Sequence, residues 1–266
     1  MVSLSQRVAI VTGGAQGVGL GIARALAQAG SCVVIANRTP ETGEAAAASI
    51  RSSAEEQGGA AYFVQTDVAE EASVGDLVEG VVERFGRLDV LVNNATPSGG
   101  SQPLERMQQD VVERYVRVNY YAAFWAMQAA FPSMKAAGFG RVINMASLNG
   151  INAHRHTAMY NASKEALRAL TRTAAAEWAR YGITCNVICP AAESEAWRSF
   201  QQYDPEGSAR ILKANPSGRM GEPEADIGPL AVFLASEGAG YITGNTIHAD
   251  GGSHINGVPW FPDLIE

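Results

Sequence analysis

The stretch VAIVTGGAQGVG, residues 8–19, decides the fold of this chain. Its apolar start predicts a buried strand, its glycines predict a tight turn, and a helical pattern follows as far as Ala29. Such a turn lets the backbone approach a pyrophosphate, which then lies against the unpaired N–H groups at the helix N-terminus. The spacing is Gly-x-x-x-Gly-x-Gly, and an ordinary strand–helix turn is the alternative interpretation. We interpret the turn as a dinucleotide-binding loop whose contacts come from Gly13, Gln16, Gly17, Val18 and Gly19.

Short runs rich in Val and Ile alternate along the chain with longer Ala-rich stretches of helical periodicity, which is the pattern of repeated β–α–β units. No linker rich in Pro or Ser and no internal repeat divides the 266 residues. We therefore predict an α/β fold: one domain over residues 1–266 with a doubly wound, seven-stranded parallel sheet and helices on both faces. The predicted strands are 8–11, 32–36, 61–65, 90–93, 141–145, 184–188 and 246–249, and the predicted helices are 19–29, 39–57, 74–85, 104–135, 158–181 and 224–236.

Composition and charge exclude several classes of protein. A content of 47% hydrophobic and 18% charged residues excludes a disordered chain, and a formal net charge of -7 without a basic run argues against a nucleic-acid partner. No apolar stretch is long enough to cross a membrane. Three cysteines are too few for a disulfide scaffold, so we expect a cytoplasmic protein. Neither the Cys185/Cys189 pair nor the His154/His156 pair is completed by further ligands, so no metal site is predicted.

The segment after the sixth predicted strand, residues 190–219, has no regular pattern and carries aromatic residues among polar ones. Ligands of open α/β sheets bind beyond the carboxyl ends of the strands, where this segment starts. We expect it to form a substrate lid in which Trp197 contacts the substrate. Its aromatic residues favour a ring-containing or apolar substrate, although aromatic lids also close over small ligands.

The end of the second strand indicates the choice of cofactor. An acidic residue there would bind the ribose hydroxyls of NAD(H), and a basic one would accept the 2′-phosphate of NADP(H). The chain has no carboxylate at Asn37, and the guanidinium of Arg38 suits a phosphate. The alternative is that Arg38 only opens a surface helix. We expect NADP(H) rather than NAD(H).

Tyr160 and Lys164 are four residues apart in a predicted helix, so their side chains project from one face. A nearby ammonium stabilises a phenolate, which is expected to lower the pKa of Tyr160 and fit it for general acid and base catalysis. Ser147, at the end of the fifth strand, can hold a substrate carbonyl oxygen while the tyrosine supplies the proton. A chance pair on a helix surface is the alternative, but Lys164 is one of only three lysines in the chain.

Together these motifs resemble the short-chain dehydrogenase/reductase family in its compact single-domain branch, from Arg7 to about Gly252. The resemblance implies a Rossmann-like fold and an NAD(P)-dependent oxidoreductase that interconverts a secondary alcohol and a ketone. The matching residues are Thr12 and Gly13 with Gly17 and Gly19, Asp67 and Val68, Asn93 to Ala95, Asn119, Ser147, Tyr160 with Lys164, Pro190, and the closing segments 242–244 and 250–252.

The resemblance also implies a role for each of these residues. Asp67 would contact adenine, Asn93 would steady the fourth strand, and Lys164 would bond the nicotinamide ribose as well as serve Tyr160. Asn119 would hold a water that links Lys164 to solvent. The same motifs place Val68, Ala95 and Pro190 at the cofactor. His154 lies between Ser147 and Tyr160, where it could contact substrate, and a solvent-exposed loop histidine is the alternative.

Four positions depart from the family pattern. Gln16 stands where many NADP-using relatives have Arg or Lys, and Thr96 replaces a glycine near the nicotinamide end of the cleft. Ala191 replaces the usual glycine after the sixth strand, and Ser194 or Glu195 stands where a threonine commonly binds the carboxamide. Nicotinamide binding is therefore expected to differ from the family pattern here.

Two other functions are compatible with the fold. A catalytically idle NAD(P)-binding regulator would need no intact Tyr–Lys pair, and a lyase or epimerase of this family would be a longer chain with a separate substrate domain. The resemblance and an apolar C-terminal tail, residues 253–266 with Trp260 and Phe261, predict a homotetramer. The alternative is a tail that folds back over its own subunit.

Overall fold

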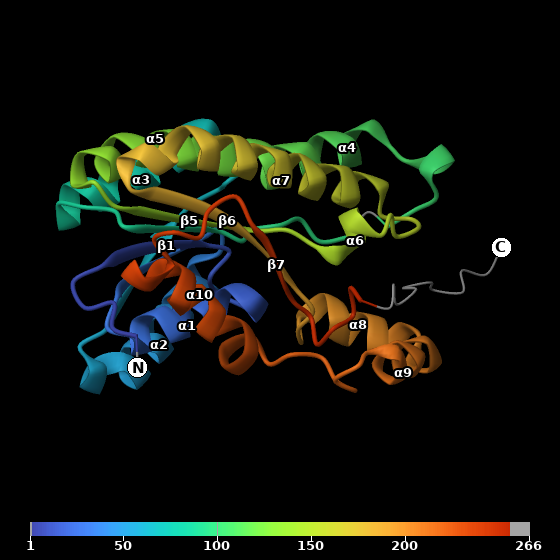
Figure 1. Ribbon diagram of the computed structural model, residues 1–266. Coiled ribbons are helices and arrows are strands. Elements are labelled where there is room, and N and C mark those ends of the chain that lie inside the picture. Colours follow the sequence, from blue (N-terminus) through green and yellow to red (C-terminus); the bar gives the residue numbers. More distant parts are fainter. Residues whose placement is uncertain (1, 100, 256–266) are drawn as a thin grey trace.

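A computed structural model of the protein describes residues 2–99 and 101–255. Seven parallel strands form one sheet in the order β3-β2-β1-β4-β5-β6-β7, which confirms the predicted doubly wound fold (Figure 1). The strand order reverses between β1 and β4, the position at which open α/β sheets bind ligands beyond the carboxyl ends. The strands are β1 Val8–Thr12, β2 Cys32–Asn37, β3 Ala60–Gln65, β4 Val90–Asn93, β5 Gly140–Met145, β6 Ile183–Pro190 and β7 Thr246–Ala249.

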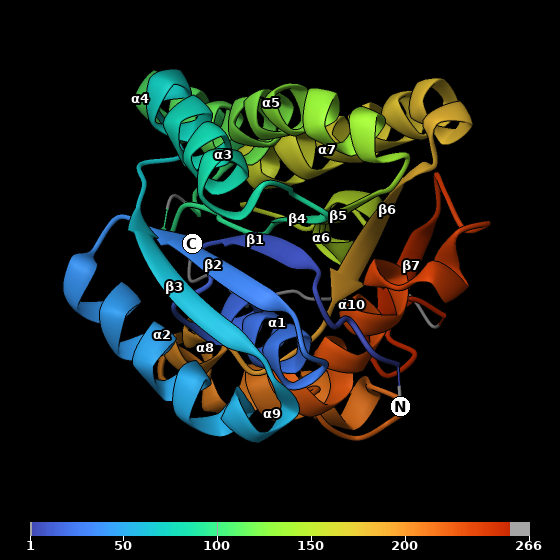
Figure 2. The same cartoon turned by 90° about the vertical axis from the view of Figure 1, so that its left-hand side faces the viewer.

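Helices cover both faces of the sheet, as Figures 1 and 2 show. The central strands are buried on both sides, which explains their continuous apolar runs: all five residues of β1 are buried. One layer holds α3 Glu71–Phe85, α4 Gln109–Val116, α5 Ala122–Ala137 and α7 Ala158–Trp178. The other holds α1 Gly17–Gln28, α2 Pro40–Ala54 and α10 Gly228–Ala235, with α8 Glu195–Tyr203 and α9 Pro205–Ala214 beyond the end of the sheet.

The single long helix predicted over residues 104–135 is interrupted. Leu104–Arg106 forms a short 3₁₀ turn, and α4 begins only at Gln109. A π-helical turn over Arg117–Tyr121 then joins α4 to α5. Such turns insert one residue into an α-helix and are frequent at functional sites. Here the turn carries Asn119, whose side chain is buried against α7.

The predicted lid is less irregular than its sequence indicates, because it contains two capped helices. Ser194 accepts a hydrogen bond from the N–H of Trp197 at the start of α8 (3.1 Å), and Asp204 accepts one from Gly207 at the start of α9 (2.7 Å). Capping side chains satisfy N–H groups that have no partner inside the helix. The apolar residues of both segments also recur at helical spacing, so the expectation of an irregular segment is wrong for α8 and α9.

None of the described helices combines the length and apolar character that crossing a membrane requires. Of the C-terminal tail, the structure describes only Ser253 to Ile255. Trp260 and Phe261, on which the predicted role of the tail in assembly depends, lie outside the described residues.

Candidate active site

The glycine loop has the backbone that a phosphate-binding turn needs. Gly13 (φ +64°) and Gly17 (φ +52°) adopt the left-handed conformation that only glycine accepts readily. Among the described residues no side chain caps α1, and its first turn holds no acidic residue, so its first N–H groups are left for a ligand at the positive end of the helix dipole. A Cβ added to Gly17 would lie 4.0 Å from the Ser194 Cβ, so the N-terminus of α1 lies close to the start of α8. These features fit a pyrophosphate group.

Thr12 and Asn94 tie this loop to the loop that follows β4. The Asn94 amide donates to the carbonyl oxygens of Thr12 (3.0 Å) and Gly13 (3.2 Å). In return the Thr12 hydroxyl oxygen accepts the backbone N–H groups of Asn94 (3.0 Å) and Ala95 (3.2 Å). The four hydrogen bonds fix Ala95 beside Gly13, where a Cβ on that glycine would lie 3.0 Å from the Ala95 Cα. Both loops therefore form one rigid wall of the cleft.

The end of β2 leaves a guanidinium exposed. The Asn37 amide donates to the Thr42 hydroxyl (3.1 Å), and Arg38 is exposed without a hydrogen bond from its side chain to any other described residue. Arg38 directly precedes Thr39, the N-cap of α2, which begins at Pro40, so both interpretations of this residue stay open. The half-buried Asp67 accepts the N–H of Ala69 (3.0 Å), whereas Val68 is buried.

Asn93 is held by a polar chain in the interior that the sequence analysis missed. Its amide donates to the Asn144 carbonyl oxygen (2.8 Å), and the Asn144 amide donates to the Thr171 hydroxyl of α7 (2.8 Å). The chain links β4, β5 and α7 beneath the cleft. The sequence held a signal for this contact, because Asn144 lies between Ile143 and Met145 in the apolar part of β5.

The structure brings Ser147, Tyr160 and Lys164 together at the carboxyl ends of β5 and β6. Ser147 follows β5 and caps the short helix α6 Leu148–Ile151, while the other two lie in the first turns of α7. The Lys164 Nζ lies 5.6 Å from the centre of the Tyr160 ring and donates to the Met145 carbonyl oxygen (2.8 Å). One of the three N–H groups of the buried ammonium is thus used to fix its position.

Burial dominates the ionisation of this pair. It lowers the pKa of Lys164 to about 8 and raises the pKa of Tyr160, with a hydrogen bond to Ser147 opposing that rise. The expected lowering of the tyrosine pKa by Lys164 is therefore not found in the described structure. Burial of the phenol outweighs the stabilisation expected from the ammonium, whose Nζ lies over the ring and donates to Met145.

Asn119 has a buried hydrogen-bond acceptor near Tyr160 and Lys164. Its amide nitrogen donates to the Ser163 hydroxyl (2.8 Å), which in turn donates to the Tyr160 carbonyl oxygen (3.0 Å). Its carbonyl oxygen Oδ1 is buried and has no hydrogen-bond partner among the described residues. A cavity of about 10 Å³ next to it is lined by Thr12, Asn93 and Lys164 among others, and this is close to the smallest volume that holds one water.

His154 and Trp197, two of the four residues predicted to contact substrate, are buried. His154 is 7% exposed and its pKa is lowered to about 4 by burial, so the alternative of a solvent-exposed loop histidine is wrong for it. Trp197 is 3% exposed and packs against Ile211 and Met220 inside the lid. Sequence reasoning missed Tyr115, whose ring meets Tyr160 edge-on at 6.1 Å and whose hydroxyl donates to the Gly99 carbonyl oxygen.

The lid joins the sheet next to the glycine loop. Pro190 ends β6, and the N–H of Ala191 donates to the Ala249 carbonyl oxygen at the end of β7 (3.0 Å). Ser194 then starts α8 opposite Gly17. Thr96, which stands where the resemblance implies a glycine, is exposed in the segment after β4.

Comparison with known proteins agrees with this geometry. A family model described as "Enoyl-(Acyl carrier protein) reductase" matches residues 13–254. The chain is 35% identical to L-fucose dehydrogenase of Oryctolagus cuniculus, over 95% of this chain and 87% of that protein. It is also 35% identical to 12alpha-hydroxysteroid dehydrogenase of a Clostridium species, over 92% of this chain and 96% of that protein. A solved short-chain type dehydrogenase/reductase from Mycobacterium ulcerans superimposes with a TM-score of 0.89 at 29% identity, over 95% and 91% of the two chains.

A glycine loop on β1, a doubly wound sheet and a serine, tyrosine and lysine grouped at its carboxyl edge define a nicotinamide-dependent oxidoreductase of alcohol or carbonyl substrates. The chain belongs to the short-chain dehydrogenase/reductase family.

Proposed function

We propose that the protein interconverts a secondary alcohol and the corresponding ketone with NADP(H) as preferred cofactor, and that Tyr160 is the general acid and base. The observation that carries the proposal is the grouping of Ser147, Tyr160 and Lys164 beside the unpartnered Oδ1 of Asn119. The named relatives act on a sugar and on a steroid, which supports a reaction class rather than one substrate.

The cofactor would lie along the carboxyl edge of the sheet. The N–H groups at the start of α1 would hold its pyrophosphate, Asp67 its adenine and Arg38 its 2′-phosphate. Ala95 and Pro190 would flank the nicotinamide, and Lys164 would bond the ribose with an N–H that Met145 leaves free. When bound, the nicotinamide gives a hydride to the substrate carbon or accepts one from it.

The side chains of the protein handle the substrate oxygen and its proton. Ser147 would donate a hydrogen bond to that oxygen, and Tyr160 would give the proton in reduction and take it in oxidation. Lys164, charged below its pKa of about 8, would stabilise the tyrosinate that forms. Asn119 would orient a water in the adjoining cavity and so pass the proton toward solvent.

A turnover assay tests this proposal. NADPH absorbance is followed with a panel of sugar ketones, ketosteroids and cyclic ketones, and NADP⁺ reduction with the matching alcohols. We expect turnover with at least one member, a drop of about 10²-fold or more in Ser147→Ala, and no change in the exposed control Tyr241→Phe. Tight NADPH binding without turnover of any member would favour the dinucleotide-binding regulator.

The homotetramer implied by the resemblance stays a prediction. Light scattering at micromolar concentration tests it, and a mass near 28.0 kDa, that of one chain, would contradict it.

A further inference from the structure

Two histidines and a carboxylate converge at the end of β7, and none of the three has a role in the proposed reaction. His248 lies in the strand, Asp250 follows it, and His254 lies in the turn that leads away. One potential ligand atom from each of the three side chains lies within 4.8 Å of the other two. We propose that this cluster binds one divalent transition-metal ion of the zinc type, because imidazole and carboxylate ligands suit such ions.

The distances between the three side chains are close to those of a bound ion. The His254 Nδ1 is hydrogen-bonded to the two carboxylate oxygens of Asp250 at 3.0 and 3.1 Å, a contact that a bound ion would replace, and the His248 Nδ1 lies 3.9 Å from Oδ2. Metal–ligand bonds of about 2.0–2.2 Å put neighbouring ligand atoms roughly 3.3–3.5 Å apart in a tetrahedral site. The two imidazole rings are stacked with centres 4.3 Å apart and an interplanar angle of 15°, so at least one ring would have to turn out of the stack for both nitrogens to bind one ion.

One ligand atom of this cluster lacks a partner. The Nδ1 of His248 is buried and makes no hydrogen bond to any described residue, although it faces the carboxylate. An unsatisfied polar atom in the interior is costly, and coordination to a metal ion would satisfy it. The atom is therefore placed as a ligand would be.

Of the other two ligands, Asp250 is held in place by hydrogen bonds and His254 is accessible from solvent. Asp250 is 3% exposed, and its carboxylate accepts the backbone N–H groups of Gly252 (3.0 Å) and His254 (2.9 Å), which orient it before an ion arrives. The side chain of His254 is 39% exposed and gives the ion a path from solvent. Three protein ligands would leave a fourth position to water.

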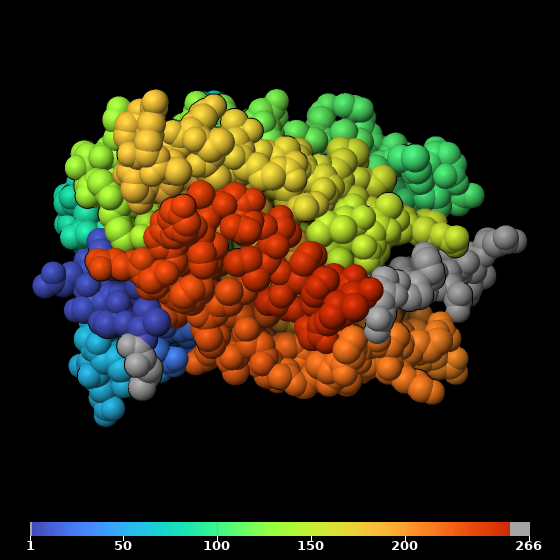
Figure 3. Space-filling model, in the orientation of Figure 1, coloured from blue at the N-terminus to red at the C-terminus, as the bar shows by residue number. Residues whose placement is uncertain are grey.

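A bound ion would stabilise the attachment of the lid. The Asn215 amide, just after α9, donates to the Asp250 carbonyl oxygen (3.2 Å) and to the Ser253 hydroxyl (2.9 Å). Figures 1 and 3 show the turn after β7, in red, between the lid helices α8 and α9 and the region of α6. Holding Asp250 would thus hold the C-terminal end of the lid.

Zinc titration of the tag-free protein tests the proposal without reference to activity. After dialysis against a chelator, calorimetry and metal analysis with Zn²⁺ alone should give one saturable site per chain. His248→Ala and His254→Ala should each weaken zinc binding at least tenfold. His156→Ala removes a histidine of the 152–157 loop and should keep the wild-type affinity.

Thermal unfolding supplies a second measurement. Zinc should raise the Tm of the wild type and of His156→Ala by several degrees, and it should leave both cluster variants unchanged. The proposal is overturned by the absence of a saturable site, or by zinc affinity that persists in both cluster variants. If His248→Ala does not fold, the more exposed His254→Ala alone decides, since its side chain contributes little to the core.

Discussion

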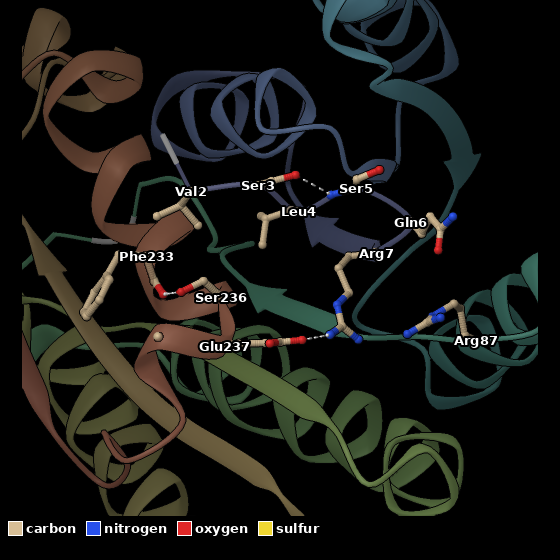
Figure 4. A pocket seen from close by; sticks show the side chains of 11 residues that line it. Val2, Ser3, Leu4, Ser5, Gln6, Arg7, Arg87, Phe233, Ser236 and Glu237 are labelled. Atoms are coloured by element: carbon tan, nitrogen blue, oxygen red, sulfur yellow. Dashed lines mark hydrogen bonds and ion pairs between the residues drawn. The ribbon is translucent and has the colours of Figure 1, made fainter.

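The amino ends and the carboxyl ends of the parallel strands, called here the amino edge and the carboxyl edge of the sheet, differ in how their buried polar groups are paired. At the amino edge Asp89 is 1% exposed and accepts hydrogen bonds from Arg7, Arg87 and the N–H of Val8. Arg7 also pairs with Glu237 across a pocket of about 490 Å³ (Figure 4). At the carboxyl edge Lys164 has no carboxylate partner among the described residues, and Asn119 keeps an unpartnered oxygen.

This difference separates a structural edge from a functional one. Charges that are already paired hold strands and loops together and offer little to a ligand, even where a large pocket opens among them. Buried polar groups left without partners are costly in the free protein, and a ligand that supplies the partners recovers that cost. Pocket volume alone would therefore place the active site at the amino edge of the sheet. Four substitutions test whether the amino edge is structural and the carboxyl edge functional.

Tyr160→Phe should have the largest effect. Removing the hydroxyl removes the proton donor and leaves the cofactor contacts in place, so kcat should fall by about 10²–10⁴-fold with little change in cofactor affinity. Steady-state kinetics and NADPH fluorescence titration measure the two quantities. Activity above about a hundredth of the wild-type value would refute the proposed role.

Asp89→Ala should lower stability and leave catalysis intact, the opposite of Tyr160→Phe. It leaves two guanidinium groups and the N–H of Val8 without their buried acceptor, so the free energy of unfolding should fall by about 3–5 kcal/mol while kcat at low temperature is kept. Denaturant titration measures the loss. Glu237→Gln at the exposed end of the same network should cost only about 0–1 kcal/mol. A large loss of kcat in folded Asp89→Ala would break the comparison.

His154→Gln should change the response to acid. The folded-state pKa of about 4 lies below the ordinary value of 6.5, so the unfolded chain binds an extra proton between these values. The stability that neutral His154 permits is present above pH 6.5 and is lost as pH falls toward 4, by roughly 3 kcal/mol in total. Unfolding midpoints across this window should therefore fall less steeply in His154→Gln, and His156→Gln controls for removing a neighbouring histidine. Equal slopes in the wild type and His154→Gln would show that burial of this ring does not govern acid sensitivity.

Arg38→Ala should give the smallest effect of the four. A guanidinium–phosphate contact contributes about 1.5–3 kcal/mol, so the ratio of kcat/KM for NADPH to that for NADH should fall about ten- to hundredfold. Arg172→Ala, an exposed arginine on α7, should keep the wild-type ratio. A wild type that prefers NADH, or an unchanged ratio in Arg38→Ala, would remove the argument for NADP(H).

Features that depend on local pattern could be predicted from the sequence, and features that depend on tertiary contact could not. The runs around Ile10 and Val34 identify strands because both faces of the sheet are buried. The partners of Asn93 and Asn119, Asn144 and Ser163, come from elements far along the chain. The raised pKa of Tyr160 depends on how deeply the folded chain buries it, which spacing to Lys164 does not reveal.

The π turn at Arg117–Tyr121 has a consequence for how this segment tolerates change in length. Each helical residue advances the side-chain direction by about 100°, so one inserted residue puts the faces of α4 and α5 out of phase by that angle. Deleting a single residue inside the turn would restore a regular helix and rotate α4, with Tyr115, relative to α5. Either Tyr115 or the buried face of α5 would then turn away from its neighbours. The length of this segment is therefore constrained more tightly than the identity of most of its residues.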